Sequence, residues 1–142
     1  MYESIVVGTD GSPTAQRAVA EATRLAGALG SELHLVSAYE PLRGVRIAGR
    51  AEVPVLPDAN VQAVVEEAAA TVRLSGVEVQ SHALTGDPAD ALLEIAQQEG
   101  ASLIVVGSCG MHGVTRVLGS VPNKVSHRAH CHVLIVATED AA

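Results

Sequence analysis

The sequence predicts an α/β domain built on a doubly wound, open parallel sheet. Five short apolar segments alternate along the chain with segments of helical periodicity. This alternation favours parallel strands joined by right-handed helical crossovers. The 142 residues are 48% hydrophobic yet include no Phe and no Trp, so Val, Leu, Ile and Ala must fill the core. Such a composition is typical of parallel strands that are covered by helices on both faces.

The first three elements are a strand, a helix and a second strand. Ser4–Val7 is a short apolar run that predicts a buried strand, and the turn Gly8–Ser12 follows it. Ser12 is a favourable N-cap, and the proline after it occupies the first helical position, where its missing N–H costs nothing. The helical stripe stops at Gly30, and Leu33–Ala38, which alternates apolar and polar residues, predicts the second strand.

A long loop is predicted next, over Tyr39–Pro57. It contains three prolines, two glycines and three arginines, Arg43, Arg46 and Arg50. A loop of this length inside a compact domain is usually functional or disordered. Asp58 then predicts the N-cap of a helix that ends at Gly76, and Val77–Leu84 predicts the third strand.

The second half of the chain continues the same alternation. Asp87 and Pro88 form another N-cap and first-turn pair, and their helix ends before Leu103–Val106, a continuous apolar run that predicts a fully buried strand. A glycine-rich turn over Gly107–Leu118 follows, and Ser120 is predicted to cap the last helix. His132–Val136 is the final strand. With no sequence repeat and no linker, we expect one domain over residues 1–142.

Composition and charge exclude several classes of function. The chain carries a net charge of −7 with 9 basic and 16 acidic residues, which argues against binding to nucleic acid or to an anionic membrane surface. Two cysteines are too few for a disulfide scaffold. There is no signal-peptide pattern and no apolar run of the roughly 20 residues that span a membrane. These features predict a cytoplasmic protein.

Two turns are candidates for a ligand site. In an open parallel sheet, ligands bind beyond the carboxyl ends of the strands, where the strand order reverses. The turn Gly8–Ser12 follows the first strand, and the turn that begins Gly107-Ser108-Cys109-Gly110 follows the fourth. In a doubly wound sheet these strands are able to be neighbours, and both turns then face one crevice.

The second turn has the chemistry of an anion site. Glycines allow backbone N–H groups to approach a bulky anion, and the helix that follows Gly119 adds unpaired N–H donors. The Ser120 hydroxyl is able to contact a phosphate oxygen or a bound metal, and Arg116 lies in the same loop. The alternative is that the glycines only shape a tight turn and Ser120 only caps its helix. The spacing matches neither a Walker A loop nor a dinucleotide fingerprint.

Several stretches resemble the universal stress protein family. They are Ile5–Ser12, Val105–Gly110 with Leu118–Val121, and Val133–Val136, and the resemblance covers the whole chain, including its length and element order. It implies a five-stranded sheet of order 3-2-1-4-5 with two helices on each face. Family members with a glycine signature bind ATP, and those that lack it do not. The signature has nine residues between its second and third glycines, whereas eight separate Gly110 from Gly119 here.

The resemblance also implies roles for individual residues. Thr9 and Asp10 would lie against the nucleoside, with the Asp10 carboxylate near the ribose or a bound Mg²⁺ ion. The alternative for Asp10 is an Asx-turn that closes its loop. The other implied contacts are to the adenine edge from backbone groups of Ser37 and Ala38, to the nucleoside from Val106 and Gly107, and to phosphates from Gly110, Gly119, Ser120 and Val121.

The predicted function is therefore adenine-nucleotide binding in a stress or regulatory role. ATP is the first expectation, and the shortened glycine loop also favours a smaller ligand such as AMP or cyclic AMP. Slow ATP hydrolysis is an alternative, although no lysine stands in the glycine turn. An interaction module without nucleotide is another alternative. The Ser-Gly-Gly-x-Asp-Ser turn of adenylate-forming pyrophosphatases is not matched by Gly8–Ser12. The resemblance implies a homodimer through the edge strand His132–Val136.

Histidines and cysteines give weaker signals. His127, His130, Cys131 and His132 cluster in sequence, but the last two begin a strand and point in opposite directions. We therefore expect solvated histidines near the end of a helix rather than a metal site. Cys109 lies in the glycine-rich turn, where a lowered pKa would make it redox-sensitive, but a small packing residue is the more common role.

Overall fold

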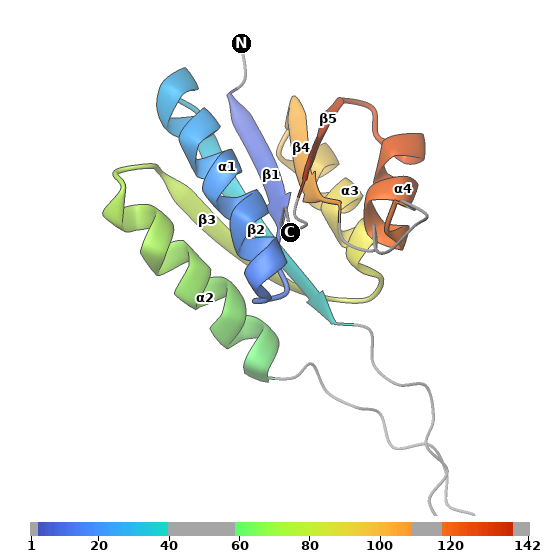
Figure 1. Cartoon of the computed structure of the whole chain (residues 1–142), viewed down its shortest axis with the longest axis horizontal. Helices are drawn as coiled ribbons and strands as arrows, with labels where there is room; N and C mark the ends of the chain where they lie inside the picture. Colours follow the sequence, from blue (N-terminus) through green and yellow to red (C-terminus); the bar gives the residue numbers. More distant parts are fainter. Residues whose placement is uncertain (1–2, 40–58, 109–117, 138–142) are drawn as a thin grey trace, which may run out of the picture.

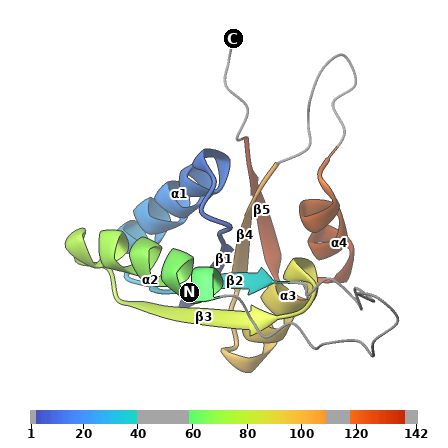
Figure 2. The ribbon, with the colours of Figure 1, turned by 90° about the horizontal axis from the view of Figure 1, so that it is seen from below.

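The sheet is parallel and five-stranded, with the strand order β3-β2-β1-β4-β5, as predicted. This arrangement is seen in a computed structural model, which describes residues 3–39, 59–108 and 118–137 (Figure 1). The elements are β1 (Ser4–Gly8), α1 (Pro13–Leu29), β2 (Glu32–Tyr39), α2 (Ala59–Leu74), β3 (Val79–Thr85), α3 (Pro88–Gln98), β4 (Leu103–Gly107), α4 (Ser120–Arg128) and β5 (His132–Val136). Helices cover both faces of the sheet, so the fold class is confirmed (Figure 2).

Several strand boundaries differ from the prediction by one or two residues, and two of them show the reason. Pairing partners, rather than apolar residues, decide where a strand begins and ends. β2 includes Tyr39, because this residue pairs with Thr85 of β3. β3 begins at Val79, the partner of Leu33, although the apolar run starts earlier at Val77. Val77 is only 9% exposed and belongs to the core without being part of the strand.

Each face of the sheet has its own apolar layer. Side chains of α1 and α2 pack with Ile5, Val7, Leu33 and Leu35 on one face. Side chains of α3 and α4 pack with Val6, Val36, Ile104 and Val106 on the other face. Successive residues of a strand point to opposite faces, so both layers draw on the same central strands. All of these strand residues are buried because β1, β2 and β4 have neighbours on both sides.

The predicted caps of two helices are confirmed and one is wrong. The Ala15 N–H donates to Ser12 Oγ at the start of α1, and the Asp90 N–H donates to Asp87 Oδ2 at the start of α3. Ser120 does not cap α4, because Gly119 is the N-cap and no side chain makes the cap hydrogen bond. The predicted cap at Asp58 lies outside the described residues.

An ion-pair network joins α3 to α4. Lys124 Nζ lies 3.0 Å from Asp87 Oδ2 and 3.0 Å from Asp90 Oδ1, and Arg128 also contacts Asp90. Burial acts to raise the pKa of Asp87, but hydrogen bonds from the Asp90 N–H and from Lys124 outweigh it and leave the pKa below its ordinary value. Asp87 is therefore both a helix cap and one of two carboxylates that pair with α4.

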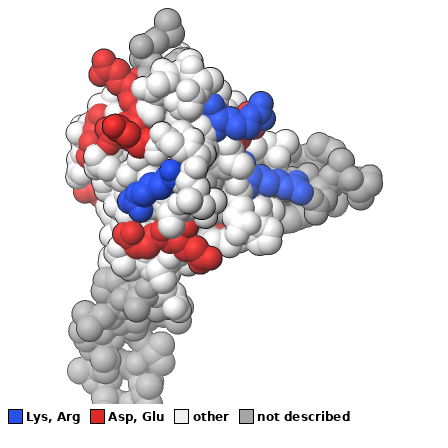
Figure 3. Space-filling model, turned by 90° about the vertical axis from the view of Figure 1, so that its left-hand side faces the viewer, with Lys and Arg blue, Asp and Glu red and all other residues white. Residues whose placement is uncertain are grey.

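The outer surface carries mixed charge. Figure 3 shows acidic and basic side chains close together on one face, and no continuous basic area is seen on this face among the described residues. In the described part of the chain, no helix is both long enough and apolar enough to cross a membrane.

Replacing Asp87 with Ala is expected to destabilise the fold by about 0.5–2 kcal/mol, the usual effect of losing an N-cap acceptor. Asp87→Asn is the matched control, because it keeps a cap acceptor and removes only the charge. Urea unfolding at neutral pH measures both. If both variants lose the same free energy of unfolding, the cap hydrogen bond is not the dominant contribution of Asp87 to stability.

The charge of Asp87 adds a pH dependence. A carboxyl group whose folded-state pKa is lowered stabilises the fold above its unfolded pKa, and this contribution is lost as pH falls through the folded value. The advantage of the wild type over Asp87→Asn is therefore expected to shrink as the pH drops below 3.8, the ordinary pKa of the group.

Candidate functional site

A pocket opens at the carboxyl ends of the strands, where β1 and β4 lie side by side. α1 follows β1 onto one face of the sheet, and α4 follows β4 onto the other, which makes this pair the topological switch point. The pocket is lined by Gly8, Thr9, Asp10, Ser12, Thr14, Ala15, Val36, Ala38, Pro88, Leu92, Val106, Gly107, Val121 and Pro122. The two predicted turns thus contribute to one crevice.

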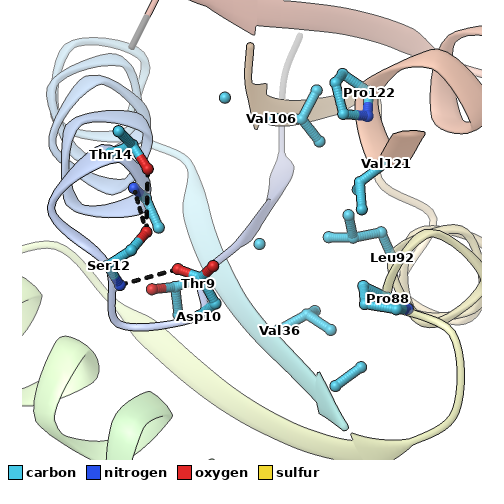
Figure 4. Close-up of a pocket in the computed structure, with 14 residues that line it drawn as sticks. Thr9, Asp10, Ser12, Thr14, Val36, Pro88, Leu92, Val106, Val121 and Pro122 are labelled. Carbon is cyan, nitrogen blue, oxygen red and sulfur yellow. Dashed lines mark hydrogen bonds between the residues drawn. The ribbon is translucent and has the colours of Figure 1, made fainter. Parts of the chain in front are cut away.

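The polar side of the pocket is the turn between β1 and α1 (Figure 4). The Thr9 N–H donates to Val36 O at 2.9 Å, and Thr9 Oγ1 accepts from the Gly11 N–H at 3.2 Å. Asp10 is exposed, and its Oδ1 accepts from the Ser12 N–H at 2.9 Å. The Asx-turn considered for Asp10 is therefore present, and the same carboxylate also lines the pocket.

Gly11 allows this turn to adopt its shape. Its φ of 81° lies in the left-handed region, which side chains with a Cβ rarely adopt. A Cβ at Gly11 would also lie 3.2 Å from Val64 Cγ1 of α2. The turn is thus held from both sides, by its own hydrogen bonds and by α2.

β2 contributes to the pocket chiefly through its backbone. β1 pairs with β2 only as far as Gly8 and Val36, whereas β2 continues to Tyr39. Alternate residues of a parallel strand bond to opposite neighbours, so Val36 and Ala38 turn their backbone groups toward β1, and Ser37 faces β3. Beyond the end of β1, the backbone of Ala38 borders the pocket. Ser37 is buried and is not among the lining residues.

The opposite side of the pocket is apolar. Figure 4 shows side chains of Leu92, Val106, Val121 and Pro122 facing the polar turn. Val106 and Val121 were predicted site residues, whereas Leu92, Pro88 and Val36 were missed. Leu92 belongs to the apolar stripe of α3, and periodicity does not distinguish a residue that faces the core from one that also borders a cavity. For Pro88, the sequence does offer a signal of a place at the pocket: it directly follows the turn at the carboxyl end of β3.

The start of α4 offers backbone donors at the edge of the pocket. The Asn123 N–H donates to Gly119 O, which is the first bond of the helix. The N–H groups of Ser120 and Val121 precede this bond, so they have no acceptor within the helix, and Pro122 has no N–H. Ser120 is exposed and, like Gly119, does not line the pocket, whereas Val121 does. A partial positive charge accompanies these donors.

Two predicted site residues, Gly110 and Arg116, lie outside the described residues, as does Cys109. The metal contact suggested for Asp10 and Ser120 stays a prediction: Asp10 lines the pocket, whereas Ser120 does not. His127, His130 and His132 are exposed, and burial raises the pKa of Cys131. None of these four belongs to a metal-ligand cluster within the described segments.

The pocket carries little positive charge. Among its described lining residues there is no lysine or arginine, and Asp10 is the one carboxylate. Lys124 is engaged by Asp87 and Asp90. Among the described residues, the groups at this pocket that are able to attract an anion are therefore backbone N–H groups and the start of α4 rather than a cluster of cations.

A family model described as the universal stress protein family matches residues 1–137. The universal stress protein Rv1636 of Mycobacterium tuberculosis is 38% identical over 143 residues, which cover 96% of this chain and 97% of that protein. The chain belongs to the universal stress protein family.

Solved structures of this family share the fold and extend the comparison to ligands. A universal stress protein in complex with cAMP is 35% identical, with a TM-score of 0.77 and coverage of 97% of this chain and 98% of the other. The universal stress protein from Archaeoglobus fulgidus in complex with dAMP is 26% identical, with a TM-score of 0.69 and coverage of 95% and 98%.

The Gly11→Ala variant is expected to lose about 1–2 kcal/mol from its left-handed backbone alone. The contact with Val64 adds to this loss. Gly30→Ala is the control, because Gly30 has a φ of 68° and nothing within 4 Å of the added Cβ. Urea unfolding of the two variants measures the difference. A smaller loss at Gly11 than at Gly30 would show that α2 does not hold the turn.

Proposed function

We propose that this chain binds an adenine mononucleotide, cyclic AMP or AMP, in the pocket at the switch point. The observation that carries the proposal is the combination of an apolar crevice with the amino end of α4 at its edge. Relatives of the same fold have been solved with cAMP and with dAMP, which supports an adenine ligand. The family resemblance also predicts an adenine nucleotide, with ATP as its first expectation and AMP or cyclic AMP as the alternative.

The base is expected to lie between the apolar side chains and the end of β2. Val36, Leu92 and Val106 offer the apolar contacts that a planar base requires. The backbone of Ala38 faces the pocket past the end of β1, so its N–H and C=O are able to bond the adenine edge. Among the two residues predicted for this contact, the geometry favours Ala38 over Ser37.

The ribose is expected to meet the β1–α1 turn. Asp10 uses Oδ1 for the Ser12 N–H, and Oδ2 is the second acceptor available for a ribose hydroxyl. Thr9 is only 7% exposed and is tied to Val36 and Gly11, so it fixes the turn while lining the pocket.

The phosphate is expected at the start of α4. The N–H groups of Ser120 and Val121 are donors of the kind that bind phosphates at helix ends. A triphosphate carries several negative charges and generally requires cations or Mg²⁺. The described lining residues include no lysine or arginine, which favours a single phosphate, and the shortened glycine loop favours it as well. Gly110, Gly119 and Arg116 remain predicted phosphate contacts, and ATP with Mg²⁺ is the competing ligand in the test.

Calorimetric titration of cAMP, AMP and ATP with Mg²⁺ tests the proposal. The monophosphates are expected to bind more tightly than ATP. Ala38→Leu is expected to weaken binding by at least about tenfold, about 1.4 kcal/mol, because the larger side chain occupies the space for the base. Ala83→Leu, at an exposed position of the neighbouring strand, is the matched control and is expected to bind as the wild type does.

Three results would contradict parts of this proposal. Absence of heat with all three nucleotides would favour an interaction module without nucleotide. Tighter binding of ATP than of the monophosphates would show that ATP, the ligand first expected from the sequence, is preferred. Equal weakening in the Ala38 and Ala83 variants would place the ligand elsewhere.

We also propose that two chains associate through β5. This strand forms an edge of the sheet, as predicted, and Ile135 is 37% exposed on it. An exposed apolar edge favours pairing with another strand. Ile135→Lys is expected to convert a dimer into a monomer in sedimentation velocity, whereas Leu74→Lys, which replaces a leucine that is 89% exposed on α2, leaves the state unchanged. A monomeric wild type at high concentration would contradict the dimer.

A further inference from the structure

Two histidines and two glutamates meet on the α3 side of the sheet, between the amino end of β2 and the middle of β3. Glu32 and His34 lie on the same face of β2, and His82 lies on the neighbouring β3, diagonally across from His34. Glu99 directly follows α3 and completes the group. One atom from each of His34, His82 and Glu99 lies within 4.8 Å of the others, the spacing of potential metal ligands.

His34 is the unusual member of this cluster. It is fully buried, and its Nε2 has no hydrogen-bond partner in the described part of the chain. Its Nδ1 lies 3.0 Å from His82 Nε2, and the two rings are stacked with centroids 5.2 Å apart. A buried polar atom without a partner is costly, so its presence requires a reason.

The surroundings of this nitrogen indicate a cation. His34 Nε2 lies 3.6 Å from Glu32 Oε1 and 3.9 Å from Glu99 Oε2, too far for hydrogen bonds. The tautomer of His34 decides which ring nitrogen carries the proton; in the tautomer whose Nδ1–H donates to His82, the Nε2 lone pair faces two carboxylates. A cation between the three atoms converts this repulsion into attraction, and two carboxylates with two neutral imidazoles balance the charge of a divalent ion.

We propose that His34, His82 and Glu99 bind a divalent transition-metal ion such as Zn²⁺, with Glu32 as the fourth donor. Imidazole and carboxylate are ordinary zinc ligands, and tetrahedral bonds of about 2.0–2.2 Å place ligand atoms about 3.3 Å apart. The separations of Glu32 and Glu99 from His34 Nε2 exceed this value by a few tenths of an ångström, so small rotations of the two carboxylates close this part of the site. His82 joins them by giving up its hydrogen bond to His34 Nδ1, so that the ring–ring bond is exchanged for two metal–nitrogen bonds.

The surroundings of the cluster favour binding. Gln80 Nε2 donates to Glu32 Oε1 and so orients this carboxylate, the role that outer partners have at metal sites. Glu32 and Glu99 are each about one-third exposed, which leaves a path for the ion to enter.

The untagged full chain tests the site by equilibrium dialysis against Zn²⁺ and by competition with a chromogenic chelator. The wild type is expected to hold one equivalent of Zn²⁺ and none of Mg²⁺, which prefers oxygen ligands and keeps its waters. His82→Ala and Glu99→Gln are each expected to weaken zinc binding by at least about tenfold. Both residues are partly exposed, so neither change empties the core.

Matched controls on the same protein are His130→Ala and Glu94→Gln, which replace an exposed histidine and an exposed glutamate of α3. Both are expected to bind zinc as the wild type does, and saturating zinc is expected to raise the melting temperature of the wild type but not of the two site variants. The proposal is overturned when the folded wild type retains no zinc, or when the site variants and the controls bind it equally. Nucleotide titration is a separate measurement, so failure here leaves the proposed function untouched.

Discussion

The pocket proposed for the nucleotide exists because the segments that follow β1 and β4 leave the sheet toward opposite faces. Two neighbouring strands then have no helix directly above the gap between them, and the crevice stays open. β2 extends past the last residue of β1, so its backbone near Ala38 is no longer used by the sheet on that side. Strand order and a difference in strand length therefore create both the space and the donors in it.

The sequence predicts the parts of this arrangement that depend on local contacts. Ser12 and Asp87 are each followed by proline, and a cap bond spans only three residues, so both caps are predictable. The cap predicted at Ser120 is wrong, because the preceding residue Gly119 takes the N-cap position and places the serine inside the helix. Serine is acceptable at either position, and one residue decides which of them it occupies.

Contacts between distant segments are where sequence reasoning falls short. Leu92 reaches the pocket only because α3 packs beneath β1, where a Cβ at Gly8 would lie 3.3 Å from Leu92 Cδ1. His34 looks like one polar position in an alternating strand, yet its partner His82 is 48 residues away. The register between β2 and β3 brings the two histidines together, and the sequence of either strand alone does not determine that register.

α3 connects the two chemically distinct regions of one sheet face. Its apolar residues, which include Leu92 and Ile95, are buried against the sheet and fix its position. Its first turn borders the nucleotide pocket through Pro88, and the residue after its last turn, Glu99, reaches the histidine cluster. The proposed nucleotide pocket offers backbone N–H groups suited to an anion, whereas the proposed metal site offers carboxylates and imidazoles suited to a cation. α3 thus extends from one proposed site to the other.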